Sequence, residues 1–203
     1  MRAMRVHAFG EPPRLTEIPA PVPAAGEALL RVRACGVNFA DTLMVAGKYQ
    51  EKPPLPLTPG MEVCGEVAAL GPGTEGLAVG QRVASFVGHG GFADYLAVPA
   101  GRCVPVPDAM PDEEVAGFLI AYGTSHVALA HRARLHPGER LVVLGASGGI
   151  GLTAVELGKL MGATVIAVAR GPEKLAVARS AGADHLIDAG EDIRAGIKAL
   201  GGA

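Results

Sequence analysis

The segment Leu141–Arg170 constrains the fold of this chain more than any other, because it has the pattern of a complete strand–helix–strand unit. Leu141–Leu144 is a short, unbroken apolar run, typical of a strand buried on both faces of a parallel sheet. A glycine cluster follows, and then a helical pattern of apolar residues ends at Gly162. A second apolar run leads to Arg170. Two strands joined by a helix predict an α/β fold with a parallel sheet.

The turn between the first strand and the helix carries a dinucleotide-binding pattern, A-x-G-x-x-G, with alanine in the place of the first glycine. Gly148 would let the backbone approach a pyrophosphate, and Gly151 would let the helix pack closely on the strand. Backbone N–H groups and the positive end of the helix dipole would hold the phosphate charge. The residues expected at the nucleotide are Ala146, Ser147, Gly148, Gly149, Ile150 and Gly151.

The residues that follow the second apolar run favour NADPH over NADH. An NADH site presents a carboxylate to the ribose 2′-hydroxyl about twenty residues beyond the glycines. This chain has no carboxylate at the strand end, whereas Arg170 and Lys174 stand within one short turn, as a 2′-phosphate would require. Alternatively, both cations are ordinary solvated charges. Asp188, after the third strand, would oppose a 2′-phosphate that lay close to it.

The same turn also fits a different class of protein, because Gly145–Gly149 matches G-x-S-x-G, the nucleophile elbow of hydrolases. A serine hydrolase would need an acid and a histidine after Ser147, and the only histidine there is His185, next to Asp184. We therefore favour a phosphate-facing role for Ser147 and keep a serine hydrolase as an alternative. A nucleotide-binding module without catalysis is the second alternative.

Composition and charge exclude several other classes. The 203 residues are 49% hydrophobic and 19% charged with a formal net charge of −2, so neither nucleic acid nor a membrane is an expected partner. No apolar run is long enough to span a membrane, and the first residues lack a signal-peptide core, so a cytoplasmic location is the default. The 3 cysteines are too few and too scattered for a disulfide framework or a CxxC metal site.

Short strands broken by turns dominate the first half of the chain, up to about Val106. Prolines then mark a boundary, and Asp112–Arg134 switches to helical spacing. We expect a β-rich domain over residues 1–110, then a helical connector and an α/β nucleotide-binding domain over residues 111–203. The expected strands are Ala3–Phe9, Glu27–Ala34, Glu62–Leu70, Arg82–Phe86, Gly91–Val98 and His185–Asp188, and the later helices are Glu173–Ser180 and Asp192–Leu200.

Short motifs occur in a fixed order along the chain. They are Gly36-Val37-Asn38-Phe39-Ala40-Asp41, Gly47-Lys48-Tyr49, Pro59-Gly60-Met61-Glu62, Gly80-Gln81-Arg82-Val83, Gly123-Thr124 and Ala146–Gly151. Together they resemble the medium-chain dehydrogenase/reductase superfamily, in particular its quinone oxidoreductase (zeta-crystallin-like) branch. The resemblance implies a GroES-like catalytic and substrate domain, then the first half of a Rossmann domain, which is a doubly wound parallel sheet. It also implies a truncated chain and, for the full-length form, a homodimer.

By this resemblance the protein would transfer hydride from NADPH to a quinone, an alkenal or an enoyl substrate. The superfamily's zinc enzymes carry cysteine and histidine ligands where this chain has Asn38 and Met61, so the resemblance implies no metal. Asn38, Tyr49 and Asp41 would form the catalytic group, with an amide N–H and a phenol as donors and Asp41 as an acceptor. Thr124 would meet the nicotinamide amide. Alternatively, Asn38 serves a turn, Tyr49 an apolar cover and Thr124 a cap.

Overall fold

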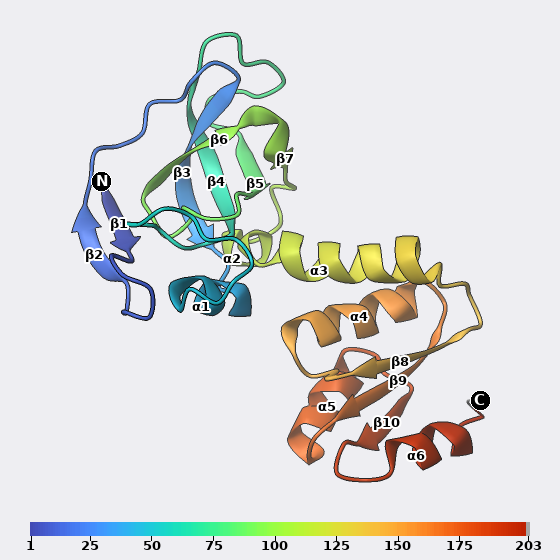
Figure 1. The fold of residues 1–203 in the computed structure, drawn as a ribbon. Helices are drawn as coiled ribbons and strands as arrows, with labels where there is room; N and C mark the ends of the chain where they lie inside the picture. Colours follow the sequence, from blue (N-terminus) through green and yellow to red (C-terminus); the bar gives the residue numbers. More distant parts are fainter. Residues whose placement is uncertain (202–203) are drawn as a thin grey trace. The chain divides into compact units, whose positions relative to one another are not determined.

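The computed structural model describes residues 1–201, and the chain divides into two compact units, Met1–Ile120 and Ala121–Ala203 (Figure 1). The first unit is built on antiparallel strands, and the second on parallel strands that alternate with helices. This confirms the expected fold class, a β-rich part followed by half of a parallel α/β sheet. Among residues 1–201 no helix is long and apolar enough to cross a membrane.

An antiparallel sheet of five strands, in the order β6-β3-β4-β5-β7, forms the framework of the first unit. Apolar side chains of β3, β4 and β5 fill its core, where Leu30, Val63, Val67 and Val83 are fully buried. The strands of this sheet are β3 (Glu27–Cys35), β4 (Glu62–Leu70), β5 (Arg82–Phe86), β6 (Tyr95–Pro99) and β7 (Cys103–Pro105). A separate ribbon pairs β1 (Arg2–Arg5) with β2 (Arg14–Glu17).

Short helices connect or follow the strands of the first unit. They are α1 (Phe39–Val45), the 3₁₀ turn η1 (Ala100–Arg102) and α2 (Asp112–Ala116). Asp112 accepts a hydrogen bond from Arg82 Nη2 at 2.8 Å and from Arg33 Nε at 3.2 Å. Arg82 also donates to the carbonyl oxygen of Met110 at 2.7 Å. These bonds fix the start of α2 to β3 and β5, which gives the arginine of the Gly-Gln-Arg-Val motif a structural role.

The second unit contains a parallel sheet of three strands in the order β10-β9-β8. Its strands are β8 (Arg140–Leu144), β9 (Thr164–Ala169) and β10 (His185–Asp188), and its helices are α4 (Gly149–Leu160), α5 (Pro172–Ser180) and α6 (Ile193–Ala199). The register pairs Leu144 with Val168 and Asp188 with Ala169, so the carboxyl ends of the strands lie at one edge of the sheet. Within residues 1–201, β8 pairs with β9 alone and leaves its other side open.

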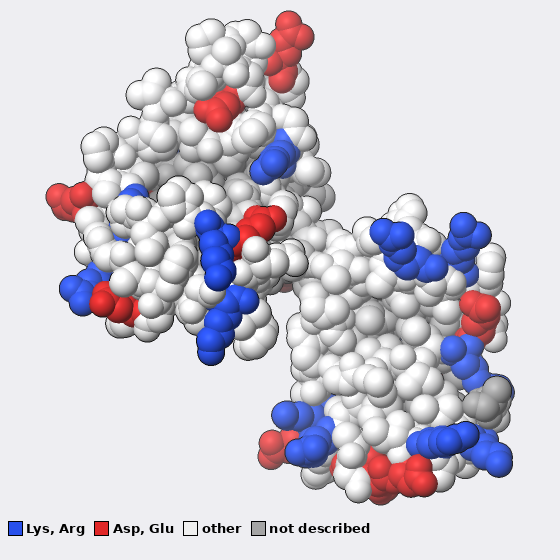
Figure 2. All heavy atoms as spheres, viewed as in Figure 1, with Lys and Arg blue, Asp and Glu red and all other residues white. Residues whose placement is uncertain are grey.

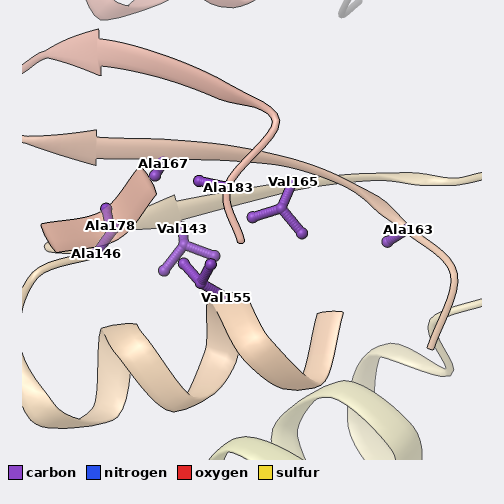
Figure 3. Packing of buried hydrophobic residues seen from close by; sticks show 8 residues of the cluster. All are labelled: Val143, Ala146, Val155, Ala163, Val165, Ala167, Ala178 and Ala183. Carbon is purple, nitrogen blue, oxygen red and sulfur yellow. The ribbon is translucent and has the colours of Figure 1, made fainter. Parts of the chain in front are cut away.

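The central strand β9 packs on both of its faces, as a doubly wound sheet requires. Val165 and Ala167 belong to a core formed with α4 and α5, whose side chains are mostly small (Figure 3). Ile166 and Val168 alternate with them and belong to a core on the other face, which includes apolar residues of α6. Gly158 brings α4 close, because a Cβ there would lie 2.5 Å from Leu141 Cδ2.

Helix α3 (Phe118–His126) continues into a π-helical segment, η2 (Val127–Ala133). This segment ends at Arg134, whose φ of 53° lies in the left-handed region that commonly closes a helix. The helical spacing predicted for Asp112–Arg134 is therefore confirmed, with an interruption at Gly117 between α2 and α3.

Charges of both signs are mixed on the surface of each unit. Figure 2 shows lysine and arginine side chains beside aspartate and glutamate on the visible faces, separated by broad uncharged areas. Arg31 pairs with Glu66 at 2.9 Å, and Lys159 pairs with Asp184 at 2.7 Å. The visible faces therefore carry no extended patch of one sign, in agreement with the net charge of −2.

Most of the predicted strands are confirmed, but three have wrong starts or ends, and the smallest difference is at Glu27–Ala34, where β3 runs on to Cys35. The strands Glu62–Leu70, Arg82–Phe86 and His185–Asp188 are confirmed without change. The strand predicted at Ala3–Phe9 is too long, because β1 ends at Arg5 and Val6 makes an isolated bridge with a loop residue. The strand predicted at Gly91–Val98 begins only at Tyr95, because the N–H groups of Gly91 and Phe92 donate to the carbonyl oxygens of the loop residues Gly60 and Pro59.

The cysteines are free thiols held in their protonated form. Burial raises the pKa of Cys35 to about 12, and the negative charges of Asp41 and Glu62 add to that effect. Burial also raises the pKa of Cys64 to about 11, with a further contribution from Asp112, to which the thiol donates. Neither thiol has the low pKa of a reactive nucleophile.

The Gly36→Ala variant should be less stable than the parent by about 1–3 kcal/mol, because the added methyl group overpacks a closed site. Its Cβ would lie 2.5 Å from the carbonyl oxygen of Ala116 and 2.8 Å from Glu62 Oε1. Urea unfolding midpoints measure the loss. Gly101→Ala is the matched control, because no heavy atom lies within 4 Å of a Cβ at Gly101. Equal midpoints for both variants would contradict this packing.

The native protein at pH 8 should resist iodoacetamide at Cys35 and Cys64. Their raised pKa values leave a thiolate fraction roughly a hundredfold or more below that of an unfolded cysteine. Peptide mass spectrometry of native and urea-unfolded samples measures both sites. Labelling of the folded protein as fast as the unfolded chain would refute the assignment.

Candidate functional site

Asn38 stands at the end of β3, where the chain turns into α1. Its main chain is extended, with φ −106° and ψ 151°, and it forms the N-cap of the helix. The side-chain Nδ2 donates to Glu62 Oε1 at 2.9 Å, so one of its two N–H bonds is already used inside the protein. The side chain also accepts the main-chain N–H of Asp41 in the capping box of α1, so the second N–H of Nδ2 is what remains for a bound molecule.

Asp41 lies below Asn38 in the first turn of α1 and is 3% exposed. Its Oδ2 accepts the main-chain N–H of Asn38 and its Oδ1 accepts the N–H of Gly60, each at 2.9 Å. The carboxylate thus joins the start of α1 to the Gly60-Met61 turn. Asp41 therefore holds two backbone segments together as a hydrogen-bond acceptor. This is the structural role that the Asn-x-x-Asp pattern suggests.

Glu62 is a site residue that sequence reasoning did not identify. It is 2% exposed, and its second oxygen, Oε2, accepts the N–H of Ile120 at 2.9 Å. Its local signals were its place in the Pro59-Gly60-Met61-Glu62 motif and a carboxylate among apolar residues at the start of a buried strand, and neither assigned it a role. Its contact with Asn38 joins residues 24 positions apart, which no local pattern reveals.

Tyr49 follows α1 and is half-buried against a cluster of apolar side chains. That cluster contains Met44 of α1 and Met61, which is 3% exposed. The structure therefore brings Tyr49 to the same helix as Asn38 and Asp41. Two large apolar side chains flank Asn38 at the surface, with Val37 80% and Phe39 78% exposed.

The glycine turn of the second unit lies at the carboxyl end of β8 and opens α4. Gly145 takes a φ of 68° and makes the tight turn, whereas the pattern had assigned the first glycine's place to Ala146. Ala146 is fully buried and donates its N–H to the carbonyl oxygen of Val168 at 3.1 Å. A Cβ at Gly151 would lie 2.3 Å from the Gly145 oxygen, so only glycine lets α4 pack here.

The first residues of α4 leave an accessible helix N-terminus. Gly148 is the N-cap, and Gly148, Gly149 and Ile150 are all exposed. No atom lies within 4 Å of a Cβ built at Gly149, so a ligand can approach the backbone there. The N–H groups of a first helical turn have no partner within the helix. Together with the helix dipole, they can hold an anion such as a pyrophosphate.

Thr124 is exposed on α3, next to a buried pair of hydroxyl groups. The hydroxyl oxygens Ser125 Oγ and Thr153 Oγ1 lie 2.8 Å apart, and Ser125 Oγ donates to the carbonyl oxygen of Ile150 at 3.1 Å. Since Ile150 belongs to the first turn of α4, these bonds join the segment of α3 that carries Thr124 to the start of α4. Glu156 of α4 makes a further hydrogen bond, with the hydroxyl of Tyr122.

Arg170 and Lys174 are both exposed at the carboxyl end of β9 and the start of α5. Gly171, with a φ of 81°, lies between them as the N-cap of α5. Asp188 holds this turn, because its Oδ2 accepts the N–H of Gly171 at 2.9 Å and its Oδ1 accepts the N–H of Gly190 at 2.8 Å. The structure thus places Asp188 directly against the turn that carries the two cations.

Among the described residues that follow Ser147 in the sequence, no histidine is placed to act as its catalytic base. His185 begins β10, whereas Ser147 lies beyond the carboxyl end of β8. In a parallel sheet these positions lie at different ends of the strands, too far apart for a nucleophile and its base. The carboxylate of Asp184 is used by Lys159 and the N–H of Val165. This geometry disfavours the hydrolase.

The donor set around Asn38 does not suit a metal ion. Asn38 Nδ2 faces a carboxylate as a donor, and Met61 is packed among apolar side chains. In the described part of the chain, no group of three or more His, Cys, Asp or Glu side chains could hold a metal. The residues present therefore do not fit the zinc site of the superfamily's zinc enzymes.

Comparison with known proteins identifies the family. The model of the alcohol dehydrogenase GroES-like domain matches residues 24–108, and that of the zinc-binding dehydrogenase matches residues 149–203. The chain is 40% identical over 172 residues to the quinone oxidoreductase-like protein 2 homolog of Nematostella vectensis, covering 83% of this chain and 47% of that protein. It is 38% identical over 173 residues to the quinone oxidoreductase of Pongo abelii, covering 83% of this chain and 53% of that protein.

A solved structure supports the same family. The quinone oxidoreductase of Thermus thermophilus, solved also in complex with NADPH, superimposes with a TM-score of 0.90 and 38% identity. The match covers 100% of this chain and 64% of that one. The chain thus spans about half the length of the curated relatives it matches. It belongs to the medium-chain dehydrogenase/reductase superfamily, among the quinone oxidoreductase-like proteins.

Proposed function

We propose that this protein is an oxidoreductase that uses NADPH to reduce a quinone or an activated enone without zinc. The observation that carries the proposal is the open N-terminus of α4 at the glycine turn, next to a strand end that bears Arg170. The family supports it, because relatives are named quinone oxidoreductases and one is solved with NADPH. NADPH would supply the hydride. The protein would position the two reactants and stabilise developing charge.

The cofactor half of the proposal rests on the second unit. The exposed N–H groups of Gly149 and Ile150 would hold the pyrophosphate. Arg170 and Lys174 would hold the 2′-phosphate, since a guanidinium and an ammonium both form charge-assisted hydrogen bonds with phosphate oxygens. Thr124, on the segment of α3 that is joined to the start of α4, would contact the nicotinamide amide.

The substrate half of the proposal rests on the first unit. Tyr49 has a phenol that can donate to an oxygen that gains negative charge. Asn38 is held in place by Asp41 and Glu62 and so needs no reorganisation when a substrate binds. The exposed side chains of Val37 and Phe39 suit a flat apolar substrate such as a quinone, an alkenal or an enoyl group.

The absence of zinc from the proposed mechanism follows from the donor set. An amide nitrogen engaged with a carboxylate and a thioether within an apolar core cannot replace thiolate and imidazole ligands. The alternatives are a serine hydrolase that uses Ser147 and a nucleotide-binding module without catalysis. For the full-length form we retain a homodimer as the expected assembly.

A reductase assay tests the function. Protein purified from its natural source should oxidise NADPH in the presence of a simple quinone. Addition of EDTA should leave the rate of oxidation unchanged. Loss of activity with EDTA and recovery with Zn²⁺ would refute the zinc-independent mechanism. Saturable NADPH binding without oxidation by any quinone or enone would instead support the binding module. Covalent labelling of Ser147 by a serine-directed phosphonate would support the hydrolase.

Substitution of Arg170 or Lys174 by alanine should weaken NADPH binding selectively. Each lost charge-assisted hydrogen bond should raise the Kd for NADPH by about tenfold or more, while the Kd for NADH changes little. Fluorescence titrations of both nucleotides against the parent and each variant measure the effect. The negative charge of Asp188 opposes binding of the 2′-phosphate. Direct contacts with two cations should outweigh this repulsion, because the carboxylate is already bound to two N–H groups.

Lys198→Ala is the matched control for these titrations. Lys198 is an exposed lysine in the last turn of α6, which runs back from the carboxyl ends of the strands. Its removal subtracts one positive charge from the same unit and should leave both Kd values unchanged. An equal increase in Kd for NADPH and NADH in the Arg170 and Lys174 variants would mean that these cations do not bind the 2′-phosphate.

A further inference from the structure

Asp188 joins two loops at the edge of the parallel sheet where a nucleotide is expected. Its Oδ2 accepts the N–H of Gly171 at 2.9 Å, and its Oδ1 accepts the N–H of Gly190 at 2.8 Å. Gly171 follows β9 and Gly190 follows β10, so both loops lie at the carboxyl ends of neighbouring strands. Ligands of open α/β sheets bind at this edge.

The carboxylate bonds to the main chain and leaves the two neighbouring cations free. Arg170 and Lys174 are exposed on either side of Gly171, and within residues 1–201 neither forms an ion pair. Asp188 therefore contacts the turn that carries both cations without neutralising either of them. A phosphate that bound to them would have no existing carboxylate partner to displace.

The turn needs an attachment because its central residue is glycine. Gly171 has a φ of 81°, and no heavy atom lies within 4 Å of a Cβ built on it, so side-chain packing does not fix its conformation. A glycine without such contacts samples many conformations, and ordering it on binding costs entropy. Here its N–H is held by Asp188, and its carbonyl oxygen accepts the N–H of Leu175 at 3.2 Å. The turn is thus ordered before any ligand binds.

We infer that Asp188 is a positioning residue that favours NADPH over NADH, against the sign of its own charge. It acts through Arg170 and Lys174, which it holds on an ordered turn. The carboxylate also repels a 2′-phosphate, but this repulsion acts through solvent and is screened, whereas the two cations act by direct contact. The positioning effect is therefore the larger of the two. The inference rests on the proposed function, because it takes NADPH as the cofactor.

The two effects of Asp188 have opposite signs, so one quantity separates them: the ratio of the Kd for NADH to the Kd for NADPH. Parent and variants are produced from the complete gene, and both nucleotides are titrated by fluorescence. Asp188→Ala removes the charge together with both hydrogen bonds, and it should lower the ratio by about tenfold. Repulsion alone predicts a higher ratio in this variant. A raised or unchanged ratio would overturn the inference.

Asp188→Asn repeats the test with a side chain of the same shape. It removes the same charge but keeps one acceptor oxygen, so one of the two hydrogen bonds can persist. Its ratio should lie between those of the parent and Asp188→Ala. If repulsion were the main effect, both variants would raise the ratio equally, since both lose the full charge.

Glu191→Gln is the matched control, because Glu191 is an exposed carboxylate of the same loop. Within residues 1–201 its side chain makes no hydrogen bond or ion pair, so the variant loses a charge and no attachment of the turn. Its ratio should equal that of the parent. A fall as large as in Asp188→Ala would show that the ratio follows the charge of the loop, and it would overturn the inference.

A double-mutant cycle distinguishes positioning of the cations from general stabilisation of the unit. When both Arg170 and Lys174 are replaced by alanine, no cation is left to position, so adding Asp188→Ala should not lower the ratio further. A further fall in that background would overturn the role assigned to the two cations. General destabilisation would instead lower the unfolding midpoint and weaken both nucleotides alike, with the ratio unchanged, which also contradicts the inference.

Hydrogen exchange at the Gly171 N–H tests the turn without any nucleotide. In Asp188→Ala this N–H should exchange faster than in the parent by about tenfold or more, because it has lost its acceptor. Equal exchange rates would overturn the inference. A parent that binds neither nucleotide would overturn the proposed function, and with it the role of Asp188 in selection. A parent that prefers NADPH, with a raised ratio in Asp188→Ala, would overturn the inference alone.

Discussion

Hydrogen bonds from the main chain to a few carboxylates hold the functional segments of this protein in place. Asp41 joins the start of α1 to the turn at Gly60, and Glu62 joins the same site to the start of α3. Asp188 does the equivalent work in the second unit, where it holds the turn after β9. Each carboxylate satisfies N–H groups that strands and helices leave free at their ends. Without these acceptors the loops would have to be solvated and would lose their defined conformations.

The fold could be predicted from the sequence wherever burial imposes a period on the side chains. β4 and β9 are long apolar runs, and the helix α4 between β8 and β9 shows helical spacing, so these elements were predicted. The short elements α1, β2 and β7 were not. The strands β2 and β7 are 4 and 3 residues long, too short for a period to appear, and β7 is defined only by its pairing with β5. Helix α1 follows Asn38 within a run of mixed residues, and its cap depends on Asp41.

The candidate site was predictable in its local parts only. The glycine turn is a single continuous segment, and its spacing identifies Gly148 and Gly151 without knowledge of the fold. Even there, the positive φ lies at Gly145, one position before the alanine that the pattern placed first. The contacts of Glu62 with Asn38 and of Asp188 with Gly171 join positions 24 and 17 apart. A single sequence contains no record of such pairings.

In the proposed zinc-independent mechanism, Asn38 and Met61 stand where the superfamily's zinc enzymes would have ligands. In a zinc site, the ligands would carry or stabilise charge through direct bonds to the ion. Here Met61 belongs to an apolar cluster and Asn38 is neutral, so the charges next to Asn38 are the carboxylates of Asp41 and Glu62. The Glu62 carboxylate cannot polarise a substrate carbonyl, because its sign is wrong for a developing oxyanion. What it can do is orient a neighbouring amide, and under the proposed function the electrophilic part of the reaction would depend on donors such as the phenol of Tyr49 and on the cofactor itself.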